Sequence, residues 1–249
     1  MFDLPTVMLA AVFATFLAAG LVKGVTGMGL PTVAMGMLGA LISPLVAASL
    51  LIVPSFATNV WQLFAGPSFG ALLRRLWPMM LAVVVGTLLG SRWIASGDTG
   101  VTTLLLGIAL IIYSTYTLFA RQFSVAGQVE TWLSPLVGGI TGIITGGTGV
   151  FVIPAVPYLQ ALGLSKDDLV QALGLSFTVS TIALAIGLGA RGAFQSDYLA
   201  LSALAVIPSL AGMWAGQHVR NRISPVAFRR GFLICLLLLG CEMASRTLL

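Results

Sequence analysis

Two glycine-rich stretches carry the residue types best suited to binding chemistry in this sequence. The first glycine stretch, KGVTGMGLP, covers residues 23–31, and the second glycine stretch, TGGTGVFVIP, covers residues 145–154. Glycine lets backbone N–H groups approach a ligand closely, and proline suits the first turn of a helix that follows. Two helix N-termini that faced each other would present free N–H groups and positive dipole ends, which favour an anion. The two stretches therefore predict an anion-binding site.

The residues expected to bind this anion lie in the two stretches and in the apolar segments that follow them. Lys23 would supply a full positive charge, and threonine hydroxyls would add hydrogen-bond donors. Asn59 and Ser176 are polar residues of the following segments, where they could line the same cavity. The predicted substrate-binding set is Lys23, Thr26, Gly27, Met28, Gly29, Asn59, Thr145, Gly146, Gly147, Thr148, Gly149 and Ser176.

The elements that must position these residues are those of a membrane protein. Of the 249 residues, 58% are hydrophobic and only 8% are charged, whereas about a quarter of the residues of a soluble domain are charged. The uncharged stretch at residues 24–73 is 50 residues long. As one helix it would reach roughly 75 Å, against a hydrocarbon core of about 30 Å. The composition therefore excludes an ordinary soluble domain and predicts several spans.

An internal duplication indicates how these spans are organised. Residues 26–36 resemble residues 146–156, and several later residues recur in the same order. Such self-similarity predicts a duplicated architecture. We expect a first membrane repeat at 1–121, a connecting loop at 122–131 and a second, inverted repeat at 132–249.

Each predicted repeat contains five apolar segments. Because five is odd, the second repeat must enter the membrane with the opposite orientation. Glu130 and Lys166 bracket only 35 residues, which is too few for two full spans and a turn. The expected fold class is therefore all-α integral membrane, with 8–10 helices in two inverted repeats, the first two segments of each half being short or re-entrant. The segments are 4–22, 30–43, 45–65, 77–95 and 100–119, then 132–144, 150–163, 168–190, 198–219 and 229–248.

The basic residues predict the orientation of the chain in a cell (inner) membrane. With alternating spans, eight of them fall on one side, which the positive-inside rule makes cytoplasmic. Arg92, Arg191 and Arg246 fall on the other side, together with both termini. Because the basic residues are scattered over span ends, they form no nucleic-acid-binding stripe. The eight are Arg74, Arg75, Arg121, Lys166, Arg220, Arg222, Arg229 and Arg230.

The acidic residues argue against catalysis and against ion coupling. No paired carboxylates lie within the spans, and no metal-binding or nucleophile motif is present, so we expect no enzyme, no cofactor and no metal. A carrier without a carboxylate in midspan would follow the membrane potential, which drives anions out of a negative interior. The acidic residues, all near predicted span ends or in loops, are Asp3, Asp98, Glu130, Asp167, Asp168, Asp197 and Glu242.

Each candidate binding feature also has a purely structural interpretation. The glycines could serve only to let helices pack closely. The stem of Lys23 could extend to the membrane interface, and in the second half the matching position, two residues before the second glycine stretch, is occupied by the uncharged Ile143. Asn59 and Ser176 could form hydrogen bonds between helices, the commoner use of such residues in membranes. The sequence leaves both interpretations open.

The sequence resembles the TauE/SafE family of sulfite and organosulfonate exporters, also called the TSUP permeases. The resemblance rests on KGVTGMGLP, on TGGTGVFVIPAVPYLQALGL and on QALGLSFTVST, and the family's fuller glycine run is interrupted here at Met28 and Thr148. It implies a membrane transporter, an exporter, of small sulfur-containing anions such as sulfite, sulfoacetate or other organosulfonates. The expected partners are that anion and the lipid bilayer. A passive anion channel, an importer of organosulfonates and a homo-oligomer stay open.

Overall fold

The structure, a computed structural model, describes residues 5–119, 124–220 and 222–248, and every regular element in these ranges is helical. Asp3, Arg121 and the first two residues of the predicted connecting loop lie outside them. The prediction of an all-α fold is confirmed. In chain order the helices are α1 (Thr6–Thr26), α2 (Leu30–Leu41), α3 (Pro44–Leu63), α4 (Phe69–Ile94), α5 (Thr99–Phe119), α6 (Gly127–Thr148), α7 (Ala155–Ala161), α8 (Lys166–Ala190), the 3₁₀ helix η1 (Ser196–Tyr198), α9 (Leu199–Leu204), α10 (Val206–Val219) and α11 (Pro225–Leu248).

Six helical stretches within the described ranges are long and apolar enough to cross a membrane. They are α1, α3, α4, α5, α8 and the stretch Leu199–Val219, which contains α9 and α10. Each has at least 20 residues, which is about 30 Å of helix. Large apolar side chains such as Val85, Leu89 and Ile207 are exposed on their outer faces, as a lipid-facing surface requires. The chain is therefore a multi-pass membrane protein.

The first segment of each predicted half is longer than the sequence indicated. Four helices correspond to the first two segments of each half. Helix α1 has 21 residues and α6 has 22, whereas α2, with 12, and α7, with 7, are short. The sequence predicts a span boundary at Glu130, whereas Glu130 lies in the first turn of α6. A carboxylate is favourable there, and Arg75 binds it through Nε at 2.7 Å and through Nη2 at 2.8 Å.

Helices α1 and α10 pack in parallel with their backbones in close contact. A methyl group added at Gly20 would overlap the carbonyl oxygen of Ser209, and one added at Gly24 would overlap that of Met213. The residue numbers rise together along both helices, so the two chains run in the same direction. Small residues at this interface let the backbones approach, which is how helices associate in a membrane.

Helices α4 and α6 form a second pair of the same kind. Gly138 faces the carbonyl oxygen of Met79, and Gly142 faces that of Val83, so these helices are also parallel. Each pair joins one helix of the N-terminal part of the chain to one of the C-terminal part. This is the arrangement that two inverted repeats would give, and the repeat boundaries stay a prediction.

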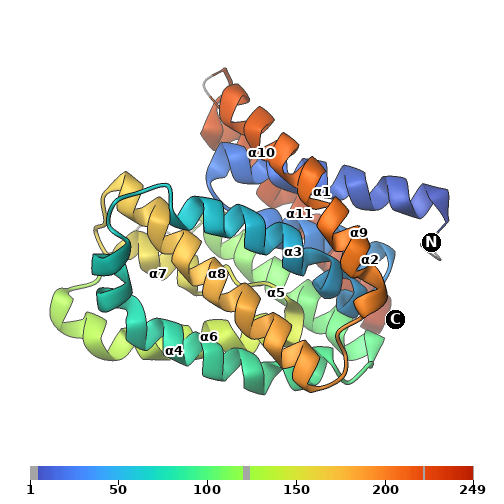
Figure 1. The fold of residues 1–249 in the computed structure, drawn as a ribbon, viewed down its shortest axis with the longest axis horizontal. Helices are drawn as coiled ribbons and strands as arrows, with labels where there is room; N and C mark the ends of the chain where they lie inside the picture. Colours follow the sequence, from blue (N-terminus) through green and yellow to red (C-terminus); the bar gives the residue numbers. More distant parts are fainter. Residues whose placement is uncertain (1–4, 120–123, 221, 249) are drawn as a thin grey trace.

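Helices α3 and α8 lie antiparallel in the interior of the bundle. They have the largest buried shares of the six candidate spans, 61% and 67%. In Figure 1 the connections from α3 to α4 and from α7 to α8 lie at the left end, and the start of α1 and the end of α11 lie at the right end. The described ends of the chain therefore share one end of the bundle, and the interior helices α3 and α8 offer the protected place for a polar site.

Candidate functional site

Lys23 lies in the last turn of α1 and points into the protein. Its side chain is 3% exposed, so the stem does not carry the charge to the surface. The ammonium donates to Thr58 Oγ1 at 3.1 Å and also to Asn59 Oδ1. Helix α1 ends just beyond it, where Gly27 adopts φ 79° and donates its N–H to the Lys23 carbonyl at 2.8 Å. The left-handed backbone at this position favours glycine over other residues.

Asn59 connects the lysine to two interior helices. Its Nδ2 donates to Ser55 Oγ at 3.4 Å on α3 and to Thr181 Oγ1 at 3.3 Å on α8. We call the five residues Lys23, Ser55, Thr58, Asn59 and Thr181 the lysine cluster. Because its members come from α1, α3 and α8, the cluster joins the end of one span to the two most buried ones.

A proline in the middle of α3, Pro54, lies one turn before Thr58 of the cluster. Pro54 has no N–H to donate, and Ser202 Oγ binds the Leu50 carbonyl at 2.8 Å. The Pro54 carbonyl in turn accepts the hydroxyl of Thr58 at 2.9 Å. Thr58 thus keeps its oxygen as an acceptor for Lys23, because its single proton is directed to the backbone.

The positive charge of Lys23 has no carboxylate partner among the described residues. The two ion pairs found in these ranges join Arg75 to Glu130 and Arg246 to Glu242. Both partners of Lys23 are neutral oxygens, and an ammonium can donate three hydrogen bonds. A buried charge is strongly unfavourable unless it is paired. The site therefore has one spare donor and an unneutralised positive charge.

Three other buried polar atoms, on α3 and α8, lack a partner in the described part of the chain. They are Ser176 Oγ and Ser180 Oγ on α8 and Gln62 Oε1 on α3. Ser176 and Ser180 are four residues apart, so they share one face of α8, and Ser180 adjoins Thr181 of the lysine cluster. The two hydroxyls are free to donate to a ligand.

The first glycine stretch lies beside the lysine cluster. Gln62 Nε2 donates to the Gly27 carbonyl at 3.0 Å, which fixes the turn after α1 to the end of α3. Thr26 uses its hydroxyl locally, donating to the carbonyls of Val22 at 2.8 Å and Met28 at 2.6 Å. Gly29 is the N-cap residue of α2. Of the predicted residues in this stretch, Lys23 is the one whose side chain enters the lysine cluster.

The second glycine stretch has different neighbours. The hydroxyls of Thr145 and Thr148 bind the carbonyls one turn earlier, each at 2.7 Å. Gly146 is pressed against the backbone of α4, and Gly149, at φ 70°, lies against Met35 in the middle of α2. Gly147 and Thr148 line an apolar groove.

The described contacts include none between the two stretches, and their facing arrangement stays a prediction. Met35 lies six residues beyond Gly29, about 9 Å along α2, and Gly29 itself contacts Val22 and Phe232. Helix α7, which follows the second stretch, has only seven residues. Of the predicted residues, Lys23 and Asn59 belong to the lysine cluster, and the binding role of the others, Ser176 included, stays a prediction.

Sequence reasoning missed Thr58, although a signal was present. Ser55, Thr58, Asn59 and Gln62 recur at intervals of three and four along an otherwise apolar segment. That spacing places them on one face of a helix. Within the described ranges no group of three or more His, Cys, Asp and Glu side chains lies together.

Comparison with known proteins gives one match. Residues 12–243 match the family described as sulfite exporter TauE/SafE. No curated protein and no solved structure matches the chain.

Proposed function

The chain belongs to the sulfite exporter TauE/SafE family, which matches nearly its whole length, and on that premise we propose that it exports small sulfur-containing anions through a site at Lys23. The family makes it a membrane transporter of the exporter type. Sulfite, sulfoacetate and other organosulfonates are the substrates we propose. The anion crosses without being chemically changed, so the protein acts as a carrier and not as an enzyme.

The buried, unneutralised ammonium of Lys23 is the observation that carries this proposal. Its side chain is 3% exposed and its described partners are neutral. A bound anion would supply the missing negative charge and accept the third N–H. The ionised sulfite and sulfonate groups have oxygens that only accept hydrogen bonds, which matches a site rich in donors.

The free hydroxyls on α8 provide a second set of donors for such an anion. Ser176 and Ser180 are buried and without partners in the described residues. An oxyanion held by Lys23 from α1 and by these hydroxyls from α8 would lie between two spans. Movement of α8 relative to α1 would then change the donors around the anion, as a carrier requires.

The positions of the acidic residues support export as the direction of transport. Of the six in the described ranges, Asp98, Asp167 and Asp197 are exposed, and Glu130, Asp168 and Glu242 are half-buried. No carboxylate in these ranges is thus positioned to couple the anion to protons or sodium. The membrane potential alone contributes about 2.3 kcal/mol per charge per 100 mV, roughly fifty-fold for a monoanion leaving a negative interior.

In the orientation that we propose, the starts of α4, α6 and α8 lie in the cytoplasm. Ser68, before α4, donates its N–H to Gln171 of α8 at 2.8 Å, and Arg75 of α4 binds Glu130 of α6, so these three starts share one end. Arg74, Arg75 and Lys166 lie there, as the positive-inside rule requires of a cytoplasmic end.

Flux into proteoliposomes tests the proposal. Vesicles that contain the purified protein are given external sulfite and an imposed potential, and internal sulfite is assayed directly. We expect saturable uptake that an inside-positive potential accelerates and an inside-negative potential suppresses, with intact sulfite recovered. Uptake that does not saturate would identify a passive channel. Dependence on a proton or sodium gradient, with indifference to the potential, would identify a coupled importer and refute potential-driven export.

A further inference from the structure

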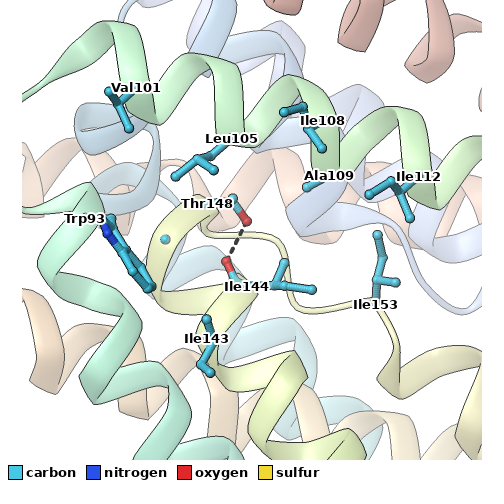
Figure 2. A pocket seen from close by; sticks show the side chains of 11 residues that line it. Trp93, Val101, Leu105, Ile108, Ala109, Ile112, Ile143, Ile144, Thr148 and Ile153 are labelled. Atoms are coloured by element: carbon cyan, nitrogen blue, oxygen red, sulfur yellow. Dashed lines mark hydrogen bonds between the residues drawn. The ribbon is translucent and has the colours of Figure 1, made fainter.

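An apolar groove of about 470 Å³ opens between α4, α5 and α6. It extends from Trp93 and Val101 at one end to Ile112 and Ile153 at the other, as Figure 2 shows. Its size lies in the range of small-molecule sites, roughly 300–1,000 Å³. The Thr148 hydroxyl in its wall is bonded to the Ile144 carbonyl at 2.7 Å, so it has no proton left for a ligand.

The groove faces the bilayer and not the lysine cluster. Ile108, Ile112 and Ile143 line it and are exposed at 41%, 53% and 41%. Because α5 is a candidate span, its exposed Ile108 and Ile112 would face lipid hydrocarbon in a membrane. An apolar hollow in that position is filled by hydrocarbon, since an empty one would lose the contacts of its lining atoms.

The length of the groove matches one leaflet of the membrane. Val101 lies in the first turn of α5 and Ile112 lies eleven residues later on the same helix. This separation is about 16 Å, close to half of a hydrocarbon core of about 30 Å. The groove therefore runs from the end of the bundle to its middle, as one extended acyl chain does.

The mouth of the groove carries the groups that a phospholipid headgroup would meet. Arg92 is exposed and its guanidinium carbon lies 5.2 Å from the centre of the Trp93 ring. Among the described residues no carboxylate forms an ion pair with Arg92. Asp98, in the same connection, accepts the N–H of Val101 at 3.0 Å and so caps α5. Tryptophan and arginine at a span end are typical of the headgroup level.

We propose that this groove binds one anionic phospholipid, with an acyl chain along α5 and the phosphate at Arg92. The site is separate from the proposed transport site, because none of its lining residues belongs to the lysine cluster. Negative charge on the headgroup complements the exposed arginine, and the apolar wall accepts the chain. The bound lipid would lie against the end of α6 and against Ile153 in the break between α6 and α7.

Native mass spectrometry of the full chain in mild detergent, with added phosphatidylglycerol or phosphatidylethanolamine of equal chain length, tests this site. The wild type should retain one phosphatidylglycerol per chain in preference to phosphatidylethanolamine. Ile108→Trp fills the groove and should reduce retention of both lipids by at least about tenfold. Arg92→Ala should lower the preference for phosphatidylglycerol about fivefold, the factor that one interfacial cation contributes.

Two matched variants serve as controls. Ile207→Trp adds the same ring to an exposed position of α10, and Arg222→Ala removes an exposed cation elsewhere. Both should retain lipid as the wild type does, and equal melting temperatures would show that all four variants are folded. Equal retention in Ile108→Trp and Ile207→Trp would refute the site. A dimer of the wild type that Ile108→Trp dissociates would also refute it, because a second copy of the chain would then cover the groove.

Discussion

Replacement of Lys23 by methionine separates the two roles that the buried lysine could have. Methionine keeps an unbranched side chain but removes the ammonium that bonds to Thr58 and Asn59. A hydrogen bond to a charged group contributes about 1.5–3 kcal/mol. Loss of the ammonium should therefore weaken the binding of sulfite about 10- to 150-fold.

The same substitution should not destabilise the protein in the absence of an anion. Methionine leaves Asn59 Oδ1 without the Lys23 donor, which costs about 1–3 kcal/mol for a buried acceptor. It also removes the penalty of burying an unpaired ammonium, which is several kcal/mol. We expect the free energy of unfolding to be unchanged or higher.

Thermal unfolding of the purified protein with and without sulfite measures both effects. The wild type should gain stability with added sulfite, because a ligand that binds only the folded state raises its free energy of unfolding. Lys23→Met should melt at or above the wild-type temperature without sulfite and gain nothing from it. Lys166→Met is the matched control, since Lys166 is exposed at the start of α8 and should behave as the wild type.

A second variant removes the binding site but keeps the lysine. Asn59→Asp places a carboxylate where the ammonium now bonds the Asn59 amide oxygen, so Lys23 acquires a permanent counterion. Sulfite binding should fall as far as in Lys23→Met, although the cation is present. The reasoning is refuted if Lys23→Met keeps the sulfite-dependent shift, or if Asn59→Asp binds sulfite as the wild type does.

Three further predictions concern the framework around the site. Gly142→Ala should lower the free energy of unfolding by about 1–3 kcal/mol, because the added methyl group overlaps the backbone of α4. Gly139→Ala is the control and should not lower it, because no atom lies near its added methyl group. Equal melting curves of the two variants would contradict the close packing. Gln171→Leu removes the hydrogen bonds from Gln171 to carbonyls of α3 and of the turn that follows α3. Hydrogen exchange of the amides in that turn should increase at least tenfold. Unchanged exchange would show that Gln171 does not hold the turn in place. The half-exposed ion pair of Arg75 and Glu130 should show a coupling energy of at most about 1 kcal/mol in a double-mutant cycle. Salt screens exposed charges, so a coupling energy that high salt leaves unchanged would contradict the exposure of this pair.

The helical segments could be predicted because charges are so scarce in the spans. The expected segment 45–65 became α3, and the expected segment 168–190 became α8. The start of α6 differs from the prediction, because a charged residue does not always mark the edge of a span. Glu130 instead belongs to the helix, where the first turn and Arg75 both favour a carboxylate.

The direction of Lys23 could not be predicted from the sequence. A long, flexible side chain in the last turn of a span can extend to water or turn inward. The choice depends on the register of α3, which brings the oxygens of Thr58 and Asn59 to the ammonium. The same limit applies to Gly146, which packs against α4, because glycine in a sequence does not reveal whether a helix or a ligand approaches it.

The two parallel helix pairs restrict the motions that can carry an anion across the membrane. Helix α1 is bound backbone to backbone to α10, and α4 to α6, through glycines that leave no space for a side chain. If residues 6–119 moved as one body against residues 127–248, both close interfaces would have to separate. The rigid bodies of a transport cycle must therefore each combine helices from both parts of the chain. The hinge positions then lie where the chain passes from one of these rigid bodies to the other, and not at the midpoint of the chain between the two parts.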